Sequence, residues 1–303
     1  MADETRNWLE MPDEIMGGMI LQRLNAVEIL ESAQKVCMNW RRICKDPAMW
    51  KVIDMDTDFD TPYDTVKLCK QAVHRSRGEL IDITLHIDET DELLDHISRC
   101  SSKLNRLCLR GCYYITGCGL INAVKMLPHL ETLELYDIDC CAEDIEAIGR
   151  NCPQLKSFTM KRDFTDRGGD VHAYAIANSM PALRHLTPAG TMDNDKIRAI
   201  LNGCPHLESL DLWGCVYLDL DENLEKLCRE RIKDFYYVRD NIRNTAPYLQ
   251  WTIMIATGHI HRSSVLNITG FLMGAFESTR IAKKKVGLLF TPVTRRAHIN
   301  LKA

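Results

Sequence analysis

The stretch that decides the fold is LNRLCLRGCYYITGCGL, residues 104–120. Its first six residues place Leu104, Leu107 and Leu109 in the frame L-x-x-L-x-L. Alternate side chains of a strand point to opposite faces, so Leu107 and Leu109 share one face, which we expect to be buried. Gly111-Cys112 then interrupts the strand, and an apolar helical segment begins at Leu120. The stretch therefore predicts one unit of strand, turn and helix.

The same frame recurs along the chain at a nearly constant spacing. Further copies begin at Leu80, Leu130, Leu155, Leu183, Leu207 and Ile232. Successive starts are 24, 26, 25, 28, 24 and 25 residues apart, and in one copy Pro188 replaces the third apolar residue. Repeats of this length that combine a strand with a helix stack into a solenoid. The predicted fold class is α/β, with a curved parallel sheet and helices on its convex side.

Helical segments are expected between the strands, where apolar residues follow a helical spacing. These segments are 120–126, 143–148, 173–177, 196–201 and 224–227. A proline precedes four of the strands, as in Leu127-Pro128-His129-Leu130. Proline ends a helix and favours extended backbone, so it suits the junction from helix to strand.

Residues 104–120 resemble the cysteine-containing leucine-rich repeat, and the resemblance implies a structural role for the cysteines. Cys112 and Cys215 occupy the turn after the strand, where a small buried thiol fits and can meet backbone carbonyls. Cys140-Cys141 and Cys152 lack the paired C-x-x-C spacing that is typical of a zinc site. We therefore expect no metal site and no cofactor.

Residues 8–50 predict a separate unit of three short helices. Pro12 and the acidic residues after it suit the first turn of a helix. Asn25 followed by Glu28 has the form of a capping box that opens a second helix. A third helix ends before Pro47. A unit of about forty residues buries little surface, which indicates that a partner covers part of it.

This unit resembles an F-box. The residues that carry the resemblance are WLEMPDEI at 8–15, Ile20-Leu21-x-x-Leu24, Val36-Cys37-x-x-Trp40-Arg41 and Asp46-Pro47-x-x-Trp50. They are particularly similar to plant F-box proteins with short leucine-rich arrays. The resemblance implies a non-catalytic substrate receptor that docks on a Skp-type adaptor and, through it, on the cullin and RING subunits of an SCF-type ubiquitin ligase. The adaptor contacts that it implies are Leu9, Pro12, Ile15, Ile20, Leu21, Leu24, Ile29, Leu30, Val36 and Trp40.

The remaining boundaries follow from the same patterns. Residues 51–79 are expected to form a linker and the first half-repeat helix, which opens at Thr61-Pro62, and residues 80–238 to form the repeats. No further frame follows near residue 257, and residues 239–303 show no dependable periodicity. We expect this tail to be disordered or to fold outside the repeat. An alternative splice form or an imperfect gene model would account for it.

The protein substrate of such a receptor is expected on the concave face, toward which the strand residues between the buried leucines point. Basic side chains there suit an acidic or phosphorylated segment, and aromatic side chains are frequent binding hot spots. The substrate-binding residues predicted on this basis are Arg106, Arg110, Tyr136, Lys161, Trp213 and Tyr236.

Composition and charge exclude several classes of function. A net charge of -4 is not typical of a protein that seeks polyanions, so nucleic acid is not an expected partner. The odd number of cysteines, 13, and the polar first residues indicate a reducing compartment, so we expect the cytoplasm, the nucleus or both. No apolar run approaches the roughly 20 residues of a membrane-spanning helix, so no membrane partner is expected.

Catalytic motifs are also absent from the sequence. It contains no glycine-rich phosphate loop, no H-E-x-x-H and no G-x-S-x-G. We therefore expect the chain not to be an enzyme. Two other functions stay open, namely a receptor in which a small-molecule ligand completes the substrate surface, and a repeat scaffold outside any ligase.

Overall fold

The computed structural model describes residues 12–55, 63–86, 90–161, 172–188, 190–212, 215–216 and 218–237. The chain divides into two units, Met1–Asp240 and Asn241–Ala303, and all the described residues belong to the first. The prediction for the tail therefore lies outside the described residues. None of the described helices has the length and apolar character that crossing a membrane requires.

The first unit begins with short helical segments that follow one another closely. They are α1 (Asp13–Ile15), η2 (Met16–Ile20), η3 (Leu21–Arg23), α2 (Ala26–Glu28), η4 (Ile29–Ala33), α3 (Gln34–Val36), α4 (Met38–Ile43) and η5 (Pro47–Trp50). The predicted capping box is present, because the Glu28 backbone N–H donates to Asn25 Oδ1 (2.8 Å) and the Asn25 N–H donates to Glu28 Oε2 (2.9 Å). Both η2 and η4 are π-helical turns.

Eight strands follow and form one parallel sheet in the order β1-β2-β3-β4-β5-β6-β8-β10. They are β1 (Val52–Asp54), β2 (Asp82–His86), β3 (Arg106–Arg110), β4 (Thr132–Tyr136), β5 (Ser157–Lys161), β6 (His185–Thr187), β8 (Ser209–Asp211) and β10 (Asp234–Tyr236). β7 (Gly190–Thr191) and β9 (Cys215–Val216) form a separate parallel pair. Each frame predicted from Leu80 to Ile232 coincides with one strand of the large sheet, which confirms the α/β repeat.

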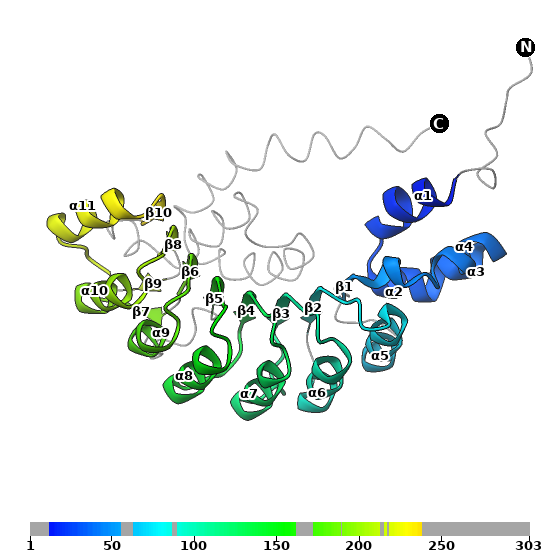
Figure 1. Ribbon diagram of the computed structural model, residues 1–303, viewed down its shortest axis with the longest axis horizontal. Helices are drawn as coiled ribbons and strands as arrows, with labels where there is room; N and C mark the ends of the chain where they lie inside the picture. The colour runs from blue at the N-terminus through cyan, green and yellow to red at the C-terminus, as the bar shows by residue number, and fades with distance from the viewer. Residues whose placement is uncertain are drawn as a thin grey trace, which may run out of the picture. The chain divides into compact units, whose positions relative to one another are not determined.

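One helix follows most of these strands. The helices are α5 (Thr65–Ser76), α6 (Asp91–Cys100), α7 (Gly117–Lys125), α8 (Ala142–Asn151), α9 (Ala173–Ser179), α10 (Asn194–Gly203) and α11 (Glu222–Arg231). Figure 1 shows the strands on the inner side of an arc and these helices on its outer side. The leucines of the frames are buried between the two layers. The helices predicted from the sequence overlap α7 to α11.

The sheet starts earlier than the sequence predicted. β1 pairs with β2 from Val52↔Asp82 to Asp54↔Thr84, so residues 51–79 contain a strand as well as α5. That helix begins at Thr65, and the expected start at 61–62 lies outside the described residues. Trp50, Ile53 and Met55 are buried at the positions that leucines hold in later repeats. The frame was missed because other large apolar residues fill it.

Candidate functional site

The N-terminal helical unit, residues 12–50, leaves large apolar side chains exposed in two patches. Ile15 and Met19 are 41% and 60% exposed on the first helical run. Val36 and Met38 are 62% and 80% exposed where α3 turns into α4. Exposed apolar groups on a small unit mark an interaction surface. Met19 and Met38 were not among the contacts predicted from the sequence, although the helical spacing from Ile15 to Met19 was a usable signal.

The predicted adaptor contacts divide by burial. Those with exposed or partly buried side chains are Pro12, Ile15, Ile20, Leu24, Val36 and Trp40. Leu21, Ile29 and Leu30 are instead buried in the core. Their side chains pack inside the unit in this structure, and direct contact of these three with an adaptor stays a prediction. Leu9 lies outside the described residues.

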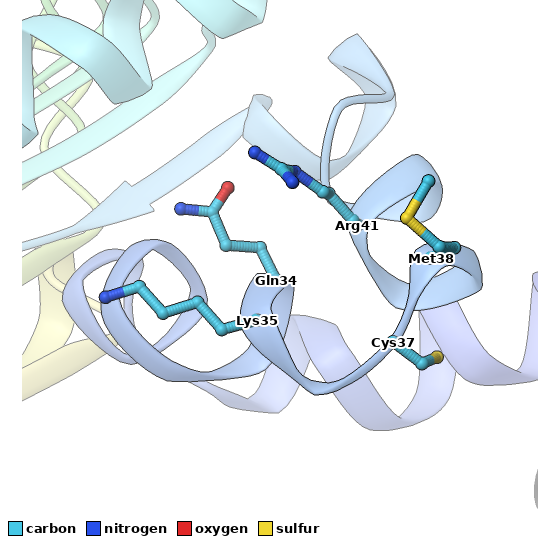
Figure 2. Close-up of a pocket in the computed structure, with 5 residues that line it drawn as sticks. All are labelled: Gln34, Lys35, Cys37, Met38 and Arg41. Atoms are coloured by element: carbon cyan, nitrogen blue, oxygen red, sulfur yellow. The ribbon is translucent and has the colours of Figure 1, made fainter.

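A hollow of about 380 Å³ lies at the turn from α3 to α4. Gln34, Lys35, Cys37, Met38 and Arg41 line it, as Figure 2 shows. The lining combines a thioether and a thiol with two basic groups. It therefore suits an apolar partner side chain that has an acidic neighbour.

On the concave face, acidic side chains of the two neighbouring strands hold Arg106 of β3. Its Nη1 donates to Asp82 Oδ1 (2.7 Å) and to Thr84 Oγ1 (3.2 Å), and its Nε donates to Glu134 Oε1 (2.9 Å). Burial opposes the charge of Arg106, but the hydrogen bonds to Glu134 and Asp82 outweigh burial and raise its pKa. The carboxylates of Asp82 and Glu134 thus compensate the positive charge of Arg106. The structure therefore does not support its predicted role as a free cation for an acidic substrate.

Arg110 stacks on the ring of Tyr136, which comes from the next strand, β4. The Arg110 Cζ lies 4.6 Å from the ring centroid, and the Arg110 Nε donates to Cys108 Sγ (3.3 Å). The Tyr136 hydroxyl donates to Glu134 Oε2 (3.2 Å). Burial and the charge of Glu134 raise the pKa of Tyr136, so the hydroxyl stays protonated. Glu134 therefore joins the Arg110–Tyr136 pair to Arg106, and three of the predicted substrate residues lie in one cluster.

The other predicted substrate residues lie outside this cluster. Lys161 of β5 stands beside Tyr136 in the strand register, one strand farther along. Tyr236 is exposed on β10, at the far end of the sheet, and Trp213 lies outside the described residues. Asp82 and Thr84 belong to the cluster but were not predicted. The alternation of residues in the frame at Leu80 was the signal that could have identified them.

The cysteines of the repeats have the expected structural role. Cys112 Sγ lies 3.8 Å from the Leu85 carbonyl oxygen, and Cys215 Sγ lies 3.5 Å from the Pro188 carbonyl oxygen. Both thiols are buried and close these turns as weak donors. Within the described ranges, no group of three or more His, Cys, Asp or Glu side chains is placed to hold a metal ion.

Comparison with known proteins agrees with both parts of the structure. Residues 8–52 match the F-box domain family. Putative F-box/LRR-repeat protein 21 of Arabidopsis thaliana is 41% identical over 253 residues, which are 76% of this chain and 81% of that protein. The chain is an F-box/leucine-rich-repeat protein.

Other relatives of this F-box/leucine-rich-repeat protein come from the same plant. F-box protein SKIP19 is 41% identical over 246 residues, which are 80% of each chain. Putative F-box/LRR-repeat protein 23 is 44% identical over 244 residues, which are 78% of this chain and 54% of that protein. The chain therefore spans about half the length of F-box/LRR-repeat protein 23.

Proposed function

We propose that this F-box/leucine-rich-repeat protein is the substrate-recognition subunit of an SCF-type cullin-RING ubiquitin ligase. The F-box helices bind a Skp-type adaptor and, through it, the cullin and RING subunits. The concave face of the sheet holds the protein to be ubiquitinated. The chain performs no chemistry itself, because its contribution is to hold an acceptor lysine near the ubiquitin donor. It acts in the cytoplasm, the nucleus or both.

The observation that carries this proposal is the apolar surface of the F-box. Ile15, Met19, Val36 and Met38 expose large parts of their side chains to water. Covering apolar surface contributes roughly 25 cal/mol for each Å² removed from water. An adaptor that covers these side chains therefore gains affinity and stabilises a small helical unit.

A fixed connection between the F-box and the repeats further supports the proposal. Arg75 of α5, the first repeat helix, donates from Nη2 to Gln34 Oε1 (2.8 Å) and from Nη1 to the Cys44 carbonyl oxygen (3.2 Å). The receptor must hold its substrate at a defined distance from the adaptor. Direct bonds between the F-box helices and the first repeat suit that task.

The test is adaptor binding by full-length protein that carries Ile15→Asp and Val36→Asp together. Placing a charge in an apolar contact is costly, so we expect at least about tenfold weaker co-purification with a Skp-type adaptor. Met126→Asp is the matched control, because Met126 is an exposed apolar residue at the end of α7, in the repeats. Circular dichroism checks that each variant is folded.

Two outcomes would overturn the proposal. One is wild-type protein with no affinity for any Skp-type adaptor, which would favour a scaffold outside a ligase. The other is a folded double variant that binds the adaptor as well as the Met126→Asp control does.

A further inference from the structure

The strand register of the sheet aligns concave-face side chains into rows that cross the strands. His86, Arg110, Tyr136 and Lys161 stand opposite one another on β2, β3, β4 and β5. We name Arg110, Tyr136 and Lys161 the cationic row. Neighbouring strands are about 4.8 Å apart, so the Arg110 and Lys161 backbones are separated by roughly 10 Å.

The cationic row differs in charge from the row that contains Arg106. Arg106 forms ion pairs with Asp82 and Glu134, which compensate its charge. None of the ion pairs among the described residues involves Arg110 or Lys161. Both oxygens of Glu134 already accept hydrogen bonds, one from Arg106 and one from the Tyr136 hydroxyl. The cationic row therefore offers two positive charges that form no ion pair with a carboxylate of the described residues, and the nearby Glu134 acts on Arg110 through its charge alone.

The contacts of Arg110 limit which edge of its guanidinium group can bind a ligand. One face of its guanidinium lies against the Tyr136 ring, and its Nε donates to Cys108 Sγ. Its two Nη groups make no hydrogen bond to a described residue, and at this edge of the plane an arginine fork can donate to one carboxylate. The ammonium group of Lys161 is a compact point charge that suits a second anion.

We propose that the cationic row binds an extended segment of the substrate that carries two Asp or Glu residues, one for Arg110 and one for Lys161. A segment in the extended polyproline II conformation advances about 3.1 Å per residue with three residues per turn, so acidic residues three positions apart lie on the same side of it and about 9 Å apart, close to the gap of roughly 10 Å. A single phosphate is bound by donors that converge on it, whereas these two cations stand two strands apart. The separation therefore favours two carboxylates over one phosphate. This inference rests on the proposed role of the chain as a substrate receptor.

The experiment measures fluorescence anisotropy of labelled peptides titrated with the purified full chain. The peptides contain two glutamates in a Gly-Ser background, with the spacing varied from adjacent positions to about six residues apart, around the optimum set by the polyproline II repeat of three residues. A Gln peptide of the same length and a peptide with one phosphoserine complete the set. We expect the tightest binding near a spacing of three, and weaker binding when salt rises from about 50 mM to about 500 mM.

Variants locate the binding surface. Arg110→Gln and Lys161→Gln should each weaken binding of the best Glu peptide by about fivefold, the effect of removing one partly exposed ion pair. Lys125→Gln is the matched control, because it makes the same charge change at an exposed residue in the last turn of α7. Its affinity should equal that of the wild type. The proposal is overturned if Glu and Gln peptides bind equally or not at all, if only the phosphoserine peptide binds, or if Lys125→Gln weakens binding as much as the row variants.

Adaptor binding is measured on the same preparations and separates this inference from the proposed function. The Arg110→Gln and Lys161→Gln variants should co-purify with a Skp-type adaptor as the wild type does. A wild-type chain that binds the Glu peptides but no adaptor would refute the ligase role and leave the peptide site standing. A chain that binds the adaptor but no Glu peptide would refute the peptide site alone.

Discussion

The guanidinium group of Arg75 in α5 lies over the indole ring of Trp50 in η5, with Cζ 5.4 Å from the ring centroid. Trp50 Nε1 donates to the Cys44 carbonyl oxygen (2.9 Å), which also accepts from Arg75 Nη1 (3.2 Å). Burial lowers the pKa of Arg75, and the Cys44 carbonyl, the Gln34 side chain and the Trp50 ring compensate the buried guanidinium. One side chain of the first repeat thus connects three points of the F-box.

Replacing Arg75 with Met should loosen the F-box from the repeats. Arg75→Met keeps an apolar stem but loses the hydrogen bonds and the cation–π contact, which together contribute about 2 kcal/mol. We expect faster hydrogen exchange in residues 34–50 and unchanged exchange in β3 to β5. Arg99→Met is the control, since the ion pair of Arg99 with Asp95 is exposed and contributes little. Equal effects of the two variants would contradict a specific junction role.

Removing the hydroxyl of Ser101 should stabilise the protein. Among the described residues, Ser101 Oγ is the buried side-chain polar atom that lacks a hydrogen-bond partner. An unsatisfied buried group costs about 1–3 kcal/mol, so Ser101→Ala should raise the free energy of unfolding by about 1 kcal/mol. Ser76→Ala is the control, because Ser76 is equally buried but donates to the Val73 carbonyl oxygen (2.7 Å) and should show no gain. Urea titrations measure both, and a destabilised Ser101→Ala protein would refute this account.

A methyl group at Gly203 should disturb the contact between α9 and α10. A Cβ there would lie 2.1 Å from the carbonyl oxygen of Ala177 and 2.6 Å from its Cα, and these backbone atoms cannot move alone. Gly203→Ala should therefore destabilise by about 1–3 kcal/mol despite the better helix propensity of alanine. Gly18→Ala is the matched control, since no heavy atom lies within 4 Å of its added Cβ. The melting temperature of Gly203→Ala should be lower than that of the wild type, and that of Gly18→Ala should be equal or higher. The opposite order would contradict the close approach of α9 to α10 at Gly203.

Ion pairs between successive repeats should make stability depend on acid pH. Lys156 Nζ lies 2.6 Å from Glu131 Oε1, and Lys103 Nζ lies 2.6 Å from Glu79 Oε1. These hydrogen bonds hold the pKa of both carboxyls below the ordinary value of 4.5. A depressed pKa gives stability that is complete above the unfolded value and is lost as pH falls through the folded value.

The measurement compares wild-type protein with Glu131→Gln and Glu79→Gln in urea titrations from about pH 7 to about pH 3, the range in which these carboxyls take up protons. At neutral pH the wild type should have a larger free energy of unfolding than either variant, and this difference should shrink below about pH 4.3. A difference that stays constant to the acid end would mean that the ion pairs do not stabilise the fold.

Much of the fold could be predicted because burial in a repeat leaves a periodic pattern. The frames from Leu80 to Ile232 located seven strands of the large sheet. The strand β1 was not predicted, because Trp50, Ile53 and Met55 take the place of leucines in its frame. Burial requires apolar volume and not leucine in particular. In the F-box, the π-helical turns η2 and η4 shift the helical phase, so spacing alone did not separate exposed from buried apolar residues.

The concave face was predicted in part. Strand alternation identified Arg106, Arg110 and Tyr136 as neighbours on that face. It did not reveal that carboxylates compensate the charge of Arg106, because Asp82 and Glu134 reach it from the strands on either side. Such pairings depend on the register between repeats. Aligning the repeats by their frames, and not only reading each strand, would have placed Asp82 opposite Arg106.

Burial also predicts which thiols react in the native protein. Burial raises the pKa of Cys152 to about 12 and that of Cys204 to about 11, whereas Cys100 and Cys118 are exposed. Because the thiolate is the reactive form, brief iodoacetamide treatment near about pH 8 should modify Cys100 and Cys118 and spare Cys152 and Cys204. Peptide mass spectrometry measures the labelling, and protein unfolded in urea, in which all four thiols should react, is the control. Modification of Cys152 in the native protein as fast as Cys118 would show that the repeat core opens more readily than its packing implies.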